Sequence, residues 1–370
     1  MICGMTDELK TIGESTHLDP QQLVVLALRQ QLGLPVTPTA SVAHELLRPA
    51  AQIALENKLL GEFAAAMAAW LIVPPIDVMT MISNYRAKAR RKARLALPTL
   101  HLLDKALTRA GIPWVAYKGH MLQLQLGRKL DRRTNADLDV LVHKSDFDRA
   151  LHALQAHSMS VAVECRSAWW RDWLGELTLT MPDSSGLPVD LHYKIQQPGC
   201  PAPRETGLLI GRSIVLQLDG IRIPTLNRVD AALNGAICIV KAIARHEYAG
   251  SHILDFAAML QNTDPAFEQA LAAEAAHQRL ERTLSLARSA AAQLLGEPKL
   301  SGLDSAVPKT DWHAVLLAPD QNDHAKIRGR ALLWALSDGR ILTRTSRFVR
   351  ESFVVIAAER ARRRGEMLAS

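Results

Sequence analysis

The segment Asp137-Leu-Asp-Val-Leu-Val142 joins two acidic residues to a run of apolar ones. Valine and leucine in such a run favour a buried strand. Side chains two positions apart on a strand point to the same face, roughly 6.5 to 7 Å from each other, so Asp137 and Asp139 look the same way. Two ionised carboxylates this close repel unless a cation lies between them. The segment therefore indicates a strand that carries a metal site.

Oxygen ligands select hard cations, and Mg²⁺ takes one or two carboxylates and leaves its other positions to water and substrate phosphates. We expect Mg²⁺ as the cofactor, or Mn²⁺ in its place. An Asp-x-Asp pattern alone is weak support, because it recurs in glycosyltransferases, in phosphatases and in exposed turns. The case depends on the residues around it.

A third carboxylate, Asp190, lies in the strand-like segment Pro188-Val-Asp-Leu-His192. If this strand lies beside the Asp-Leu-Asp strand, Asp190 joins the acidic pair; alternatively, it is an edge-strand acid that faces water. His192 points the same way as Asp190 and either contacts substrate or is a hydrogen-bonded structural histidine.

Lys118-Gly119 follows a predicted strand at residues 112–117 and begins a predicted helix. Glycine permits close approach of the backbone to a phosphate, and a helix N-terminus offers free N–H groups. Lys118 adds a positive charge. Arg132 and Arg133, in the loop before the acids, either neutralise them or bind a triphosphate, although loop arginines are most often solvated.

The pattern in the rest of the chain predicts helical regions before and after the strands that form a sheet. Residues 23–97 have helical periodicity, as do residues 229–241, 252–260 and 267–295. Hairpins are expected at residues 177–192 and at 214–223, the second around Asp219-Gly220. We predict an α+β fold with a helical N-terminal region (1–95), a core that holds a mixed sheet (96–225) and a helical C-terminal region (226–370).

Composition is consistent with this fold. Apolar residues make up 48% of the 370 residues and aromatic residues only 5%, which favours helices rich in alanine and leucine. The net charge of +7 suits a polyanionic ligand, and equally a basic surface. The six cations of residues 86–94 are interpreted as a solvated helix face in preference to a nucleic-acid site, since no aromatic residues interleave them.

The cysteines and the N-terminus predict a cytoplasmic protein without a membrane span. Cys3, Cys165, Cys200 and Cys238 form no CxxC pair, so neither a zinc site nor a disulfide framework is expected. The N-terminal residues lack the pattern of a signal peptide, and the most apolar stretch, residues 63–73, is too short to cross a bilayer.

Three segments, Ile112-Pro-Trp-Val-Ala-Tyr-Lys-Gly119, Asp137-Leu-Asp-Val-Leu-Val142 and Val189-Asp-Leu-His192, together with Arg133, resemble the uncharacterised bacterial nucleotidyltransferase family. That family lies within the polymerase-beta-like nucleotidyltransferase superfamily, and the resemblance covers roughly residues 96–260. It implies a nucleotidyltransferase-fold mixed sheet and a metal pair held by Asp137, Asp139 and Asp190. Lys118-Gly119 stands where the superfamily typically has glycine-serine, and a long spacer of 17 residues separates Gly119 from Asp137.

The resemblance implies an enzyme that moves a nucleoside monophosphate from a nucleoside triphosphate to an acceptor hydroxyl or phosphate. The sequence does not identify the acceptor, so a small molecule, a peptide and RNA stay open. A metal-dependent glycosyltransferase is one alternative, although it would need a nucleotide-binding α/β half before the acids. A non-catalytic nucleotide- or peptide-binding protein is another. His246 and Asp255 lie in the family's helical region, where core packing or solvation is favoured over a role at the site.

Overall fold

The structure, a computed structural model, describes residues 18–36, 42–165, 167–182, 185–297, 300 and 311–319, with scattered residues between 345 and 363. The expected helical N-terminal region is present. Its helices are α1 (Pro20–Gln31), α2 (His44–Glu56), α3 (Leu60–Ala69) and α4 (Ile76–Leu103). α1 begins with a capping box in which Asp19 and Gln22 satisfy each other's backbone N–H groups, and Pro20 occupies the first turn.

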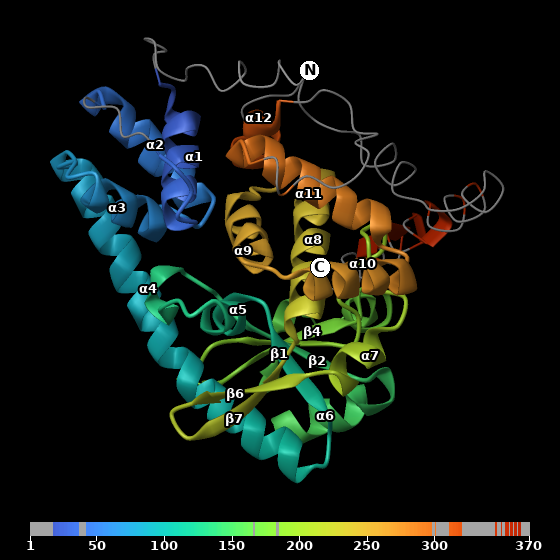
Figure 1. The fold of residues 1–370 in the computed structure, drawn as a ribbon. Coiled ribbons are helices and arrows are strands. Elements are labelled where there is room, and N and C mark those ends of the chain that lie inside the picture. The colour runs from blue at the N-terminus through green and yellow to red at the C-terminus, as the bar shows by residue number, and fades with distance from the viewer. Residues whose placement is uncertain are drawn as a thin grey trace.

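The long helix α4 joins the N-terminal helices to the sheet (Figure 1). The helical periodicity of the N-terminal region is expected only to residue 97, but α4 continues through Pro98 to Leu103 and is followed by a π-helical turn, Asp104–Thr108. Pro98 is exposed, so the carbonyl that loses its helical partner there can be hydrated instead. The predicted boundary between residues 95 and 96 therefore falls inside one helix.

The central sheet has five strands: β1 (Trp114–Tyr117), β2 (Leu138–Val142), β3 (Ser160–Val161), β4 (Glu176–Thr180) and β5 (Val189–His192). Their order is β1-β2-β5-β4-β3. β2 and β5 run parallel, whereas the other neighbours are antiparallel. The mixed α+β architecture predicted from the sequence is therefore confirmed, and the strand of Asp190 lies beside that of Asp139.

The two faces of the sheet have different partners. Leu138, Val140 and Val142 pack into a core that includes the end of α4 and α6 (Phe147–Gln155). Val115, Tyr117 and Leu141 belong instead to the core of the helical regions. Because alternate residues share a face, Asp139 lies on the second face, the one packed against helices of the N- and C-terminal regions.

The expected hairpin at Asp219-Gly220 forms a separate two-stranded sheet of β6 (Ile214–Leu218) and β7 (Ile221–Thr225). Both turn residues have positive φ, 45° for Asp219 and 81° for Gly220, as a type I′ turn requires. The short helix α7 (Thr206–Gly211) precedes it.

The C-terminal region is helical, as predicted. Its helices are α8 (Arg228–Arg245), α9 (Gly250–Leu260), α10 (Pro265–Gln278), α11 (Glu281–Leu295) and α12 (Trp312–Leu317). The periodic stretch 267–295 forms two helices, since Arg279 ends α10 with a left-handed φ of 60°. None of the described helices combines the length and the apolar content that a membrane crossing requires.

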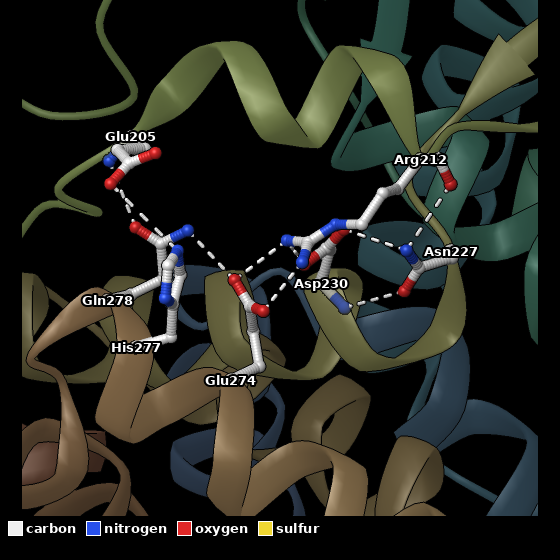
Figure 2. Close-up of polar contacts among 7 residues, drawn as sticks. All are labelled: Glu205, Arg212, Asn227, Asp230, Glu274, His277 and Gln278. Atoms are coloured by element: carbon white, nitrogen blue, oxygen red, sulfur yellow. Dashed lines mark hydrogen bonds and ion pairs between the residues drawn. The ribbon is translucent and has the colours of Figure 1, made fainter.

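A buried polar network fastens α7 and β6 to the C-terminal helices (Figure 2). The Arg212 guanidinium donates to both carboxylate oxygens of Glu274 at 2.6 and 2.7 Å and to Asp230 Oδ1 at 2.8 Å. Asn227, the N-cap of α8, donates to Asp230 Oδ2 at 2.7 Å. Burial nevertheless raises the pKa of Asp230 to about 6. Because every carboxylate has a partner, this network is interpreted as structural.

A second buried ion cluster joins three parts of the chain. Arg133 Nε lies 2.9 Å from Glu62 Oε1 of α3, and Arg133 Nη1 lies 2.6 Å from Asp255 Oδ2 of α9. Arg128 Nη1 contacts the other Asp255 oxygen at 2.8 Å. At Gly61 a Cβ atom would come within 2.3 Å of the Arg132 carbonyl oxygen, so only glycine lets α3 approach this loop so closely.

We predict that Arg133→Met lowers the free energy of unfolding by about 3 to 5 kcal/mol, because it leaves buried carboxylates without this cation. Arg149→Met is the matched control. Its ion pair with Asp146 is exposed, so a loss of about 1 kcal/mol or less is expected. Urea denaturation followed by circular dichroism measures both; equal effects would contradict a structural role for the buried cluster.

Candidate metal centre

The parallel register of β2 and β5 creates the acidic centre. Asp139 lies opposite Asp190, and Leu141 opposite His192. One ligand atom each from Asp139, Asp190 and His192 lies within 4.8 Å of the others. Two carboxylates and one imidazole therefore converge on the sheet face that packs against the N- and C-terminal helices.

Lys118 supplies a positive charge to this centre. Its Nζ lies 3.3 Å from Asp139 Oδ1 and 4.6 Å from the centre of the Tyr117 ring. Burial is the largest single effect and disfavours the charged amine, but Asp139 together with Tyr117 and Cys238 raises the pKa of Lys118 well above its ordinary value. Lys118 also has φ 62° and ψ −170°, a backbone conformation that is almost restricted to glycine. The backbone is thus strained at the residue that balances the acids.

Asp139 is held ionised by two partners. Its Oδ1 also contacts His192 Nε2 at 3.2 Å. Burial favours the neutral carboxyl, yet Lys118 and the His192 hydrogen bond keep the pKa of Asp139 below its ordinary value. The Tyr117 ring meets the imidazole edge to face, with centroids 5.9 Å apart.

Asp137 has the opposite electrostatic balance. Burial, followed by the charges of Asp139 and Asp190, raises the pKa of Asp137 to about 6. Lys58 and Lys118 oppose that rise. Repulsion from the other two predicted acids is therefore not balanced at Asp137. The ligand atoms that form the candidate metal group come from Asp139, Asp190 and His192.

The other residues expected at the site lie in different surroundings. Arg133 is buried in the ion cluster with Glu62 and Asp255, and Arg132 Nη1 donates to Gln31 Oε1 at 2.8 Å. Gly119 begins α5 (Gly119–Gln125), where an added Cβ would touch the Asn135 side chain at 3.5 Å. The predicted packing role of Asp255 agrees with its ion pairs.

Four further residues around the centre were not predicted. Thr178 Oγ1 donates to Asp190 Oδ1 at 2.6 Å, and Glu176 Oε2 lies 3.3 Å from His192 Nδ1. The alternation in Glu176-Leu-Thr-Leu-Thr180 is the sequence signal that places Glu176 and Thr178 on one face. Lys58 and His252 come from the helical regions, and no local pattern marks them. The charge of Lys58 opposes the rise in the pKa of Asp137, whereas burial and the nearby cations, Lys118 among them, lower the pKa of His252 to about 4.

The donor set fits a divalent cation. Ligands about 2.1 Å from an octahedral ion lie about 3 Å apart when adjacent and about 4.2 Å apart when opposite. Because the three ligand atoms lie within 4.8 Å of one another, shortening their separations by at most about 2 Å would seat an ion among Asp139, Asp190 and His192. His192 Nδ1 is buried without a hydrogen bond, so the imidazole can turn or change tautomer at little cost.

A mixed sheet that brings paired carboxylates from adjacent strands beside a lysine, ahead of a helical region, is the arrangement expected of a nucleotidyltransferase. The model of the uncharacterised nucleotidyltransferase family matches residues 40–296. The chain therefore belongs to the uncharacterised nucleotidyltransferase family. No curated protein matches the sequence.

The strain at Lys118 predicts that Lys118→Gly is more stable than Lys118→Ala by about 1 to 2 kcal/mol. Both variants lose the amine, so the difference reports on the backbone alone. Lys88, on the exposed face of α4, is the control: there Gly should be less stable than Ala by about 1 kcal/mol. Chemical denaturation measures the four variants, and the same sign at both positions would disprove the strain.

The raised pKa of Asp137 predicts a pH-dependent cost to stability in metal-free protein. The folded state binds this proton more tightly than the unfolded state, whose pKa is near 3.9, so stability falls as pH rises from about 4 through about 6. Asp137→Asn should raise the melting temperature above pH 6 and have little effect below pH 4. Thermal unfolding in chelator tests this, and a difference independent of pH would contradict it.

Proposed function

We propose that this protein is a metal-dependent nucleotidyltransferase of the polymerase-beta-like superfamily. It would transfer a nucleoside monophosphate from a nucleoside triphosphate to an acceptor hydroxyl or phosphate. The observation that carries the proposal is the pairing of Asp139 with Asp190 across β2 and β5, beside Lys118, in a member of a nucleotidyltransferase family.

The proposed roles follow from position and charge. Asp137, Asp139 and Asp190 would hold divalent cation, Mg²⁺ or Mn²⁺. When bound, that cation would neutralise charge on the triphosphate and on the attacking oxygen. Lys118 and the exposed Lys58, whose charges act on Asp137, would bind phosphate oxygens, and Gly119 would let the backbone approach them.

In the proposed reaction, an acceptor oxygen forms a bond to the α-phosphorus while the bond from that phosphorus to the bridging oxygen breaks. Pyrophosphate leaves with the electron pair. Asp190 is the residue we propose to take the acceptor's proton, because Thr178 fixes its Oδ1 and leaves Oδ2 to receive it. The acceptor itself is not identified by these residues.

We predict that Asp190→Asn reduces transfer of label from an α-³²P nucleoside triphosphate by at least about 10³-fold, with the fold unchanged. Asparagine keeps the Thr178 hydrogen bond and removes only the charge. Asp139→Asn is a less selective test, since it also takes the partner from Lys118. Asp219→Asn, in the exposed β6–β7 turn, makes the same chemical change away from the centre and should retain full activity.

The assay supplies cell extract as the source of acceptor, with labelled nucleoside triphosphates and Mg²⁺ or Mn²⁺, and identifies labelled products by mass spectrometry. Transfer of a sugar from a sugar nucleotide would instead support a glycosyltransferase. The described residues before β1 are helical and supply no nucleotide-binding α/β half, which argues against that alternative. Metal-dependent nucleotide binding without any product would support a binding protein.

A further inference from the structure

We propose that His192 is itself a metal ligand, positioned by Glu176, and that the centre consequently prefers Mn²⁺ to Mg²⁺. The inference deepens the proposed function and rests on it. It differs from the carboxylate-only centre expected from the sequence, because it assigns a nitrogen donor and a residue that orients it.

The first support is the position of His192. Its side chain is 5% exposed, and Nε2 lies 3.2 Å from Asp139 Oδ1. His192 shares a strand face with Asp190 and completes the group whose ligand atoms lie within 4.8 Å of each other. A cation between the two acids therefore comes within reach of Nε2.

The second support is the adjacent strand, β4. Its register places Thr178 opposite Asp190 and Glu176 opposite His192. Thr178 hydrogen-bonds Asp190, and Glu176 Oε2 lies 3.3 Å from His192 Nδ1. One strand thus supplies an orienting partner to each of the two ligands that β5 carries.

The contact between Glu176 and His192 suits a ligand histidine. Metal-bound histidines commonly donate their second ring N–H to a carboxylate, which fixes the tautomer and the ring plane. In this structure Nδ1 lacks hydrogen-bond geometry, and the Glu176 side chain is 32% exposed, so its carboxylate is free to rotate into line. The proton would then sit on Nδ1, which leaves the Nε2 lone pair directed at the acids.

A nitrogen donor changes which cation the centre selects. Mg²⁺ prefers oxygen ligands and retains water, whereas imidazole raises affinity for transition ions over Mg²⁺. Two carboxylates with one imidazole therefore favour Mn²⁺ among the ions that support phosphoryl chemistry. Glu176 acts through His192 and is a positioning residue.

The test measures Mn²⁺ binding directly on the full-length protein. Mn²⁺ is titrated and free Mn²⁺ is followed by electron paramagnetic resonance, with Mg²⁺ as competitor. Electron spin echo modulation then detects ¹⁴N coupled to bound Mn²⁺. The wild type should show one histidine nitrogen and bind Mn²⁺ more tightly than Mg²⁺.

We expect His192→Ala to abolish the ¹⁴N coupling and to lower Mn²⁺ affinity far more than Mg²⁺ affinity. Glu176→Ala should retain the coupling but weaken Mn²⁺ binding about 10- to 100-fold, the usual effect of removing a partner of a ligand histidine. Glu176→Gln, which can still accept from Nδ1, should restore part of that loss. Glu164→Ala, at an exposed glutamate, is the control and should bind as the wild type does.

Two failures can be told apart. Mn²⁺ that binds in an Asp190-dependent manner without ¹⁴N coupling, or with an unchanged Mn²⁺/Mg²⁺ ratio in His192→Ala, overturns the histidine ligand and leaves the carboxylate centre standing. Mn²⁺ that binds equally well to wild type and Asp190→Asn overturns the metal centre itself, and with it both this inference and the proposed function.

Discussion

The repulsion between Asp139 and Asp190, placed opposite each other on the parallel strands β2 and β5, is the constraint that organises this protein. Two carboxylates on the covered face of a sheet are costly unless positive charge or hydrogen-bond donors reach them. Lys118 from the end of β1, His192 from β5 and Thr178 from β4 do so. His192 and Thr178 belong to strands of the same sheet and Lys118 directly follows β1, so the sheet brings these compensating groups to the acids.

The strained backbone of Lys118 reflects the same constraint. Here lysine adopts a backbone conformation that suits glycine. A lysine in this place brings its amine to Asp139 without a longer loop.

The helical regions are held around the centre by buried ion pairs and not only by apolar packing. Arg133, four residues before Asp137, links α3 to α9 through Glu62 and Asp255. This arrangement fixes the loop that leads into β2, close to where the charge of Lys58 acts on Asp137. Arg133 therefore joins the helices around this loop, whereas the sequence left open whether it neutralises the acids, binds a triphosphate or is solvated.

Local pattern determined much of this protein: the helical regions, the strand after Asp137, the turn at Asp219-Gly220 and the acids themselves all follow from periodicity, turn chemistry and charge within a few residues. Local pattern did not determine the continuation of α4 through Pro98, because that depends on solvent reaching one carbonyl group. It also did not determine which groups pair with each charged side chain. Arg133 has the same local context whether it meets a phosphate or Glu62, 71 residues away, and only the packed chain decides between them. The set of metal ligands is also decided by the tertiary structure. Alternation along β2 and β5 shows which way Asp139 and His192 point. Which atoms come within reach of one cation depends on the register between the strands, a long-range property of the sheet.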